Sequence, residues 1–341
     1  MTRKPGSPSR RTLLLGATGT LVGVAACSGG SSHTAPSQSG TARSGRASAA
    51  SGSVAAFPPT SQAAALPPTT PWRPTSAEVT PAAKLRAVQV VEAIGAWPSG
   101  KGGAAAARAR VAALRLPTGL VDEAGPLLPD ADAAVLQVVN AQYGGILTDS
   151  ASVLVVCRQW TSRGGRVSAG GTTVDVRLTR AASGWTVTAL YPAQPGAAVS
   201  ALPARARAVL ADSRVELPPA AQADLHSGQV HDSVLAAMLR LAGTYRMYVS
   251  VVRSGHPLDV FGTSRPSDHP LGRAFDVWQI DGHAVVDPAT SRTLIERFMR
   301  DAAAAGSYNV GGPVLLSGGG AANQFFSDNT HHDHVHIGFD H

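Results

Sequence analysis

Apolar positions first recur at helical spacing shortly after residue 80. The pair Thr80-Pro81 is typical of a helix start, because proline fits the first helical position. Four apolar residues then share one helix face: Leu85, Val88, Val91 and Ile94. The pattern predicts a helix from Pro81 to about Trp97, and an Ala- and Arg-rich segment predicts another over 104–116.

Runs rich in β-branched residues follow these helices. Glycine-containing segments at 163–165 and 181–184 are typical of the turns between such strands. The predicted strands cover 136–146, 152–161, 172–178 and 185–190. Helices followed by an antiparallel sheet predict a small α+β domain over 81–200. It carries no recognisable catalytic constellation, so we expect a spacer or protein-contact role.

The last third of the chain alternates between helical and strand periods. The predicted helices cover 201–211, 232–242 and 291–306, and the predicted strands 247–251, 274–280, 310–316 and 334–339. The Asp281-Gly282 pair predicts a tight turn after the second of these strands. Together they predict a second small α+β domain over 201–341, so the expected fold class is α+β with two such domains.

Residues 1–26 have the features of a bacterial export signal. Basic residues, including the pair Arg10-Arg11, precede an apolar stretch of residues 13–26 that is too short to cross a bilayer. The paired arginines are similar to a twin-arginine signal. Val24-Ala25-Ala26-Cys27 resembles a lipobox, so we expect lipid on Cys27 and anchoring to the outer face of the cytoplasmic membrane. Cleavage without lipidation is the alternative.

Residues 27–80 are dominated by Ser, Gly, Ala, Thr and Pro. Such a composition buries too little apolar surface to offset the entropy of ordering, which predicts a flexible linker. The formal charge of +7 includes four basic residues within the signal, leaving about +3. Without a basic cluster, nucleic acid is not an expected partner. Cys157 lies in an apolar run and is interpreted as a small buried hydrophobic residue.

Candidate metal ligands lie in two short segments, Ser267–Asp276 and Asp333–His336. His269, Asp276 and His336 form a set of two imidazoles and one carboxylate, which suits a Zn²⁺ ion that leaves one position open for water. Asp333 is of the type needed to accept a proton from that water. His334 shares the strand face of His336, which predicts a supporting or oxyanion-stabilising role.

Alternatives to this assignment remain. His334 could replace His336 as the ligand, and His331 or His332 could shape the rim or bind the metal. Asp276 lies among apolar residues, where an unpaired carboxylate is costly. A metal would compensate its charge, and an ion pair with Arg273 or Arg265 is the structural alternative.

The pattern Ser-x-His-x-x-Gly-x-Ala-x-Asp, matched by Ser267–Asp276, followed by Asp-x-x-His, matched by Asp333–His336, resembles the zinc D-alanyl-D-alanine carboxypeptidases of the VanY type. The resemblance covers about residues 230–341. It implies the fold of those peptidases, one zinc on His269, Asp276 and His336, Asp333 as general base, and hydrolysis of peptidoglycan stem peptides.

One element of that family is missing. The family has Ser-Gly-Tyr-Arg before the metal loop, where this chain has Ser254-Gly255-His256-Pro257. Arg253, His256 or Arg265 could take the role of the absent arginine. With Ser267, these are the predicted substrate-binding residues. A catalytically inactive, zinc-containing cell-wall binding lipoprotein is therefore the main alternative, and a metal-capture protein using the His-rich C-terminal segment is a third.

Overall fold

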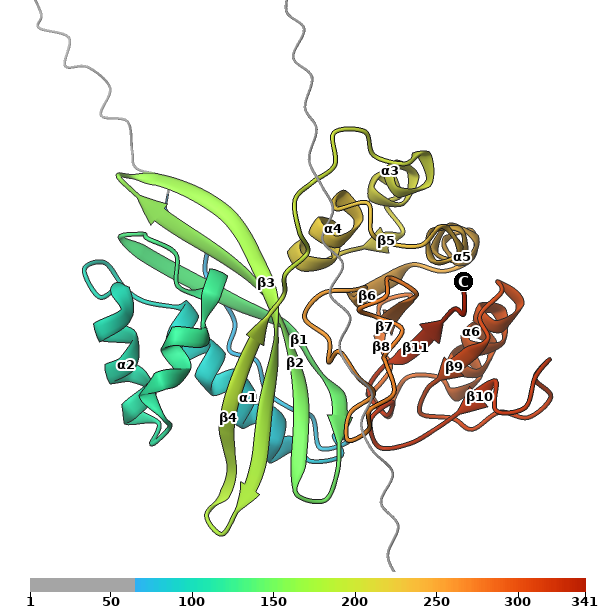
Figure 1. The fold of residues 1–341 in the computed structure, drawn as a ribbon, viewed down its shortest axis with the longest axis horizontal. Helices are drawn as coiled ribbons and strands as arrows, with labels where there is room; N and C mark the ends of the chain where they lie inside the picture. The colour runs from blue at the N-terminus through green and yellow to red at the C-terminus, as the bar shows by residue number, and fades with distance from the viewer. Residues whose placement is uncertain (1–64) are drawn as a thin grey trace, which may run out of the picture. The chain divides into compact units, whose positions relative to one another are not determined.

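The computed structural model describes residues 65–341. The predicted signal, Cys27 and most of the predicted linker lie outside the described residues. Two sheets organise the described part, and helices cover them (Figure 1). The mixed α+β class predicted from the sequence is confirmed.

The first module, residues 81–192, is a helix-covered antiparallel sheet. Its strands pair in the order β1-β2-β3-β4. Their bounds are β1 Ala133–Ile146, β2 Ser150–Arg163, β3 Arg166–Ala181 and β4 Gly184–Pro192. The helical segments are α1 Pro81–Gly95, α2 Gly103–Ala113, η1 Thr118–Glu123 and η2 Gly125–Leu127. Helix α1 lies against all four strands, and its apolar face joins them in one core.

The second module, residues 204–339, surrounds a seven-stranded sheet in the order β10-β9-β11-β7-β6-β5, with β8 beside β7. The strands are β5 Val215–Glu216, β6 Met247–Val251, β7 Ala274–Ile280, β8 His283–Ala284, β9 Asn309–Gly311, β10 Phe325–Phe326 and β11 Val335–Gly338. The helices are α3 Ala204–Ala211, α4 Pro219–His226, α5 Asp232–Ala242 and α6 Arg292–Ala304. A separate core runs from Ala206 to Phe339.

Most elements lie within a few residues of their predicted ranges, but helix α4 was not predicted, and strand β3 begins six residues earlier than expected. The strand expected over 310–316 is limited to Asn309–Gly311. The two-residue strands β5, β8 and β10 were not predicted, because two residues show no alternation. The Asp281-Gly282 turn is present, with both residues at positive φ as a tight hairpin requires.

The linker prediction is wrong for residues 70–80. Trp72 packs against the core of the first module, and Thr70 exchanges two hydrogen bonds with Gln137 of β1. Glu78 is buried. The low hydrophobicity of this segment hid these contacts, because single anchoring side chains leave no periodic signal.

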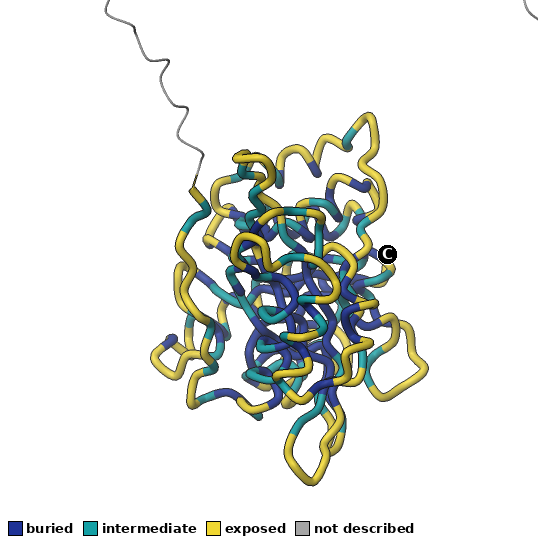
Figure 2. The backbone as a smooth tube through the Cα atoms, turned by 90° about the vertical axis from the view of Figure 1, so that its left-hand side faces the viewer, coloured by how far each residue is buried: buried dark blue, intermediate teal, exposed yellow. Residues whose placement is uncertain are grey.

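Strand β2 is buried on both of its faces. Val153, Val155 and Cys157 belong to the core under α1, whereas Leu154 and Val156 contact Val251 of β6. The two sheets therefore meet through an apolar contact, and dark-blue buried backbone fills the middle of the molecule in Figure 2. Cys157 is buried, as expected.

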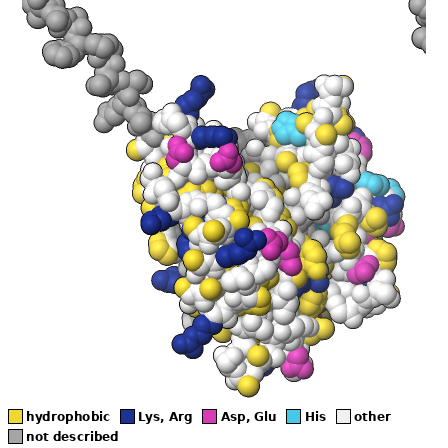
Figure 3. Space-filling view, turned by 60° about the vertical axis from the view of Figure 1, so that its left-hand side comes forward, with side chains coloured by type: hydrophobic (Ala, Val, Ile, Leu, Met, Phe, Trp, Pro, Cys, Tyr) yellow, Lys and Arg dark blue, Asp and Glu magenta, His cyan; other side chains and the backbone are white. Residues whose placement is uncertain are grey.

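On the face drawn in Figure 3, Lys and Arg side chains are dispersed, and several lie beside Asp or Glu side chains. Within residues 65–341 no helix combines the length and apolar character that crossing a bilayer would require.

Candidate metal centre

The loop that carries His269 lies between β6 and β7 and has a tight backbone conformation. Gly272 has a φ of 72°, and its amide donates to the carbonyl of His269 at 2.8 Å. A Cβ at this position would overlap the carbonyl oxygen of Gln229. Glycine is therefore required, and the turn brings His269 back over Asp276 at the start of β7.

Strand alternation delivers the other donors. On β7, Phe275 and Val277 enter the core of the second module, so Asp276 points to the opposite face. On β11, His336 pairs directly with Asp276 across the antiparallel ladder. The pairing of β7 with β11 thus brings His336 close to Asp276 and to His269, which lies 67 residues earlier in the sequence.

The three predicted ligands form a close triangle. His269 Nε2 lies 3.1 Å from Asp276 Oδ1 and 3.1 Å from His336 Nδ1, and His336 Nδ1 lies 3.0 Å from Asp276 Oδ1. Two ligands of a tetrahedral zinc with bonds of 2.0–2.1 Å are about 3.3 Å apart. The observed spacing is therefore close to that of a zinc ligand set.

The hydrogen bond of His269 Nδ1 determines which ring nitrogen faces the triangle. His269 Nδ1 lies 2.8 Å from the carbonyl oxygen of Val252, which can only accept, so the ring proton is on Nδ1. In the neutral ring Nε2 then has a free lone pair, and it faces a carboxylate oxygen. A proton or a metal ion can bridge a nitrogen and an oxygen acceptor at this distance, and a set of two imidazole nitrogens and one carboxylate oxygen is one that binds a divalent metal.

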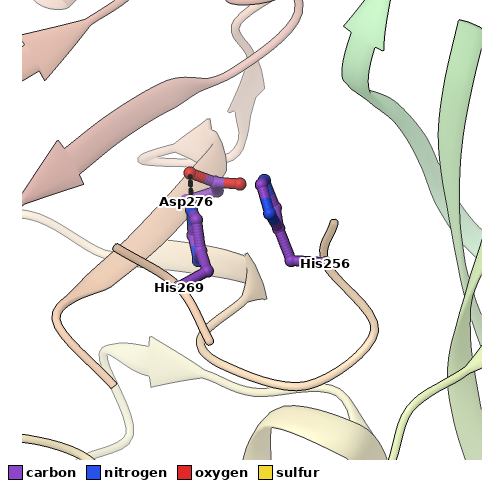
Figure 4. Close-up of side chains that lie close together, drawn as sticks. All are labelled: His256, His269 and Asp276. Atoms are coloured by element: carbon purple, nitrogen blue, oxygen red, sulfur yellow. Dashed lines mark hydrogen bonds and ion pairs between the residues drawn. The ribbon is translucent and has the colours of Figure 1, made fainter. Parts of the chain in front are cut away.

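His256 adds a further donor to this group. His256, His269 and Asp276 lie close enough together to hold a metal ion, and Figure 4 shows all three side chains converging. The His256 ring stacks on that of His269, with centroids 4.1 Å apart. Its Nδ1 contacts the carbonyl oxygen of Pro257 at 3.0 Å, which leaves Nε2 unprotonated. We predicted His256 as a substrate-binding residue, and the structure places it among the candidate metal ligands.

Buried Asp224 of α4 fixes the loop that carries His256. Its Oδ2 accepts hydrogen bonds from the backbone amides of Arg253 and Ser254, at 3.0 and 2.9 Å. The Ser254 hydroxyl donates to Oδ1 at 2.6 Å. These three bonds hold the chain two residues before His256, which limits how far its imidazole can move.

Asp333 does not have the surroundings expected of the general base. Its Oδ2 lies 2.5 Å from the Lys84 ammonium of α1 and accepts from the amide of Tyr143 at 3.1 Å. Its Oδ1 faces His334 Nδ1 at 2.6 Å. Both oxygens are therefore engaged. Burial alone would raise the pKa of Asp333, but Lys84 and His334 hold it below its ordinary value.

The two carboxylates bracket His334. Its Nδ1 donates to Asp333, and its Nε2 lies 3.7 Å from Asp276 Oδ2. Burial lowers the pKa of His334, but the carboxylates of Asp276 and Asp333 outweigh burial and raise it. Burial alone would raise the pKa of Asp276, but the nearby imidazoles of His269 and His334 hold it well below its ordinary value.

A cavity of about 880 Å³ opens beside this cluster. His256, Ser267, His334 and His336 line it, whereas Asp333 does not. Residues 143–147 of the first module form part of its wall, together with exposed Arg265. Both modules therefore shape the space in which a ligand could reach the candidate metal centre.

The predicted substrate-binding residues are not all on this cavity. Arg253 lines a second cavity of about 730 Å³, and its guanidinium donates to the carbonyl oxygen of Pro195. Ser267 is buried, and its hydroxyl accepts from the amide of His269, which is a structural role within the loop. Arg265 is the remaining cationic candidate for the missing family arginine.

The sequence predicted that His331 or His332 could shape the rim of the site, and His331 does line the cavity, with its ring centroid 5.2 Å from that of His334. His331 Nδ1 contacts Asp328 at 2.8 Å, and His332 Nε2 contacts the carbonyl oxygen of Ala77 at 2.7 Å. The alternative pairing of Asp276 with Arg273 or Arg265 is not observed among its contacts, which are to Gln142, Ser250 and imidazoles.

Two buried polar residues of the first module reach the site and were not predicted from the sequence. Gln142 of β1 donates from Nε2 to Asp276 Oδ2 at 2.7 Å. Lys84 of α1 pairs with Asp333 and with buried Glu78. Lys84 carried a usable signal, because it shares the apolar helix face of Val88 and Val91. A spacer role for this module does not account for these contacts.

Comparisons of this chain with protein-family models, with curated proteins and with solved structures found no match.

Proposed function

We propose that this chain is a zinc-dependent peptidase that hydrolyses peptidoglycan stem peptides outside the cytoplasmic membrane. The observation that carries the proposal is the triangle of His269, Asp276 and His336, whose facing nitrogen and oxygen atoms lie 3.0–3.1 Å apart, close to the spacing of a zinc ligand set. Bound there, zinc would lower the pKa of a coordinated water to about 7 and polarise a substrate carbonyl. The resemblance of two sequence segments to the VanY-type carboxypeptidases supplies the substrate class.

The proton-accepting role passes from Asp333 to His334 in this proposal. His334 lines the cavity, and its Nε2, 3.7 Å from Asp276 Oδ2, makes no hydrogen bond within residues 65–341, whereas both oxygens of Asp333 are occupied. Asp333 orients the imidazole through Nδ1, as a carboxylate does in other acid–base pairs. His334 accepts a proton from the attacking water and returns it to the leaving amine.

The remaining cavity residues bind and orient the peptide. Arg265 is exposed at the cavity and can receive the terminal carboxylate of a stem peptide, as guanidinium groups do. His256 either completes the ligand set or contacts the scissile carbonyl. The lipid on Cys27 would keep the enzyme at the membrane surface, near the wall.

Metal content and cleavage of muropeptides test the proposal. We expect purified full-length protein to hold about one zinc per chain and to release D-alanine or cleave cross-links. The variant Asp276→Ala should lose the metal. His334→Ala should keep the metal but lose about 10²–10⁴-fold in rate. Metal-free wild-type protein that gains no thermal stability from added zinc would contradict the assignment.

A catalytically inactive, zinc-containing binding lipoprotein is the second candidate, favoured by the engagement of Asp333 with Lys84. It predicts one zinc per chain with no cleavage of any muropeptide, and unchanged muropeptide binding in His334→Ala. Cleavage that His334→Ala abolishes would exclude it.

A further inference from the structure

The first module presents an unusual polar residue to the second. On β1, Leu136 and Val138 face the core under α1, and three residues after Val138 the core positions become Ala141 and Tyr143. The even-numbered and odd-numbered positions exchange faces because the register slips between Val138 and Asn140. Gln142 consequently points away from its own core, toward β6 and β7.

Gln142 is fully buried, and its partners fix the orientation of its amide. Nε2 donates to Asp276 Oδ2 at 2.7 Å, and Oε1 accepts a hydrogen bond from the Ser250 hydroxyl of β6. The reverse orientation would place the amide oxygen against a carboxylate oxygen. Gln142, Ser250 and Asp276 are each at most 1% exposed, so water does not compete for these bonds.

Because of this contact, the two carboxylate oxygens of Asp276 have different partners. Oδ2 is held by the amide, and Oδ1 faces His269 and His336. A neutral donor orients the carboxylate without neutralising it. A lysine or arginine would instead neutralise the carboxylate, as Lys84 neutralises Asp333.

We infer that Gln142 is a positioning residue for the metal ligand Asp276, so that the candidate metal centre is completed only by the first module. The inference rests on the proposed metal-binding role of Asp276. Outer partners of ligating carboxylates commonly change metal affinity by about 10–100-fold. The second module without residues 81–192 would retain every ligand but lose this hydrogen bond.

The test compares zinc affinity of full-length Gln142→Leu with that of the wild type, by competition with a chelator. We expect about a 10–100-fold weaker Kd. The absorption spectrum of the Co²⁺-loaded protein should also change, because Asp276 is free to rotate. Gln159→Leu is the matched control: Gln159 is a buried glutamine on β2 that bonds only backbone carbonyls within the first module. It should lower stability while leaving zinc affinity and the Co²⁺ spectrum unchanged.

Ser250→Ala provides a milder variant that keeps the Gln142 amide but removes its anchor, and a smaller loss of zinc affinity is expected. Unchanged affinity in both Gln142→Leu and Ser250→Ala would overturn the inference, as would an equal loss in Gln159→Leu. A wild-type protein that binds no zinc would overturn the proposed function itself, which distinguishes the two failures.

Discussion

Two buried carboxylates of the second module, Asp276 and Asp333, differ in what balances their charge. Both are at most 5% exposed, and both have a pKa below the ordinary value. Asp333 faces the ammonium of Lys84, a fixed positive charge supplied by the chain. Asp276 faces imidazoles and the neutral amide of Gln142.

The difference separates a structural anchor from a candidate ligand. A buried carboxylate that a lysine already neutralises gains little from a metal, and breaking the pair leaves an uncompensated charge. A buried carboxylate that faces two imidazole nitrogens at the spacing of a zinc ligand set can gain more from a metal. The same residue type therefore holds the two modules together at Asp333 and prepares a metal centre at Asp276.

The largest expected effect comes from removing the ammonium. Lys84→Met should destabilise the protein by about 3–5 kcal/mol, because Asp333 and Glu78 are left buried without their cation. Urea unfolding measures this loss. Zinc affinity should change much less, since Lys84 contacts no member of the triangle. A stability loss below about 1 kcal/mol would break the contrast between the two carboxylates.

The double variant Lys84→Met/Asp333→Asn sharpens the result. Removing the charge of Asp333 in the absence of Lys84 should restore part of the stability lost in Lys84→Met, so the two changes are not additive.

Acid should act on the Asp276 cluster before it acts on Asp333. Burial lowers the pKa of His336 from an ordinary 6.5 to about 4. Between about pH 6.5 and 4, His336 is therefore protonated in the unfolded chain but neutral in the folded chain. The free energy of unfolding of the metal-free protein falls by ~3 kcal/mol as the pH drops through this range. Asp333 has a lowered pKa, so its contribution is present above about 3.8 and is lost only below that pH.

Urea unfolding of metal-free protein across this range tests the order of these events. His336→Gln should flatten the dependence between pH 6.5 and 4 and leave the loss below 3.8 in place. An equally steep dependence in His336→Gln would contradict the assignment of this window to the Asp276 cluster.

The smallest effect concerns the backbone that shapes the Asp276 cluster. Gly272→Ala should cost about 2 kcal/mol more than Gly282→Ala. Both glycines have positive φ, but only a Cβ at Gly272 meets backbone, whereas none lies near Gly282. Zinc affinity should fall only in Gly272→Ala, because the loop that carries His269 has to shift. Equal costs for the two substitutions would indicate that the loop is not held tightly.

The local sequence pattern determined most helices and strands, and it identified a set of residues of the types that bind zinc. Alternation over a few residues placed Asp276 opposite the core residues Phe275 and Val277, and His336 on the face of His334. The spacing His269-x-x-Gly272 required a tight return of the chain, which the structure contains. These features depend on neighbours in sequence, so they could be predicted without knowledge of the packing.

The tertiary structure decided what those groups contact. Asp333 was predicted as the general base from its spacing to His336, but its partner Lys84 lies about 250 residues earlier in the chain. Gln142 faces Asp276 only because a bulge in β1 exchanges the faces of that strand. No residue near the bulge is of a type that would predict it from the sequence. Sequence spacing fixes chemistry within one element, whereas charge compensation in a buried site depends on which distant elements the folded cores bring together.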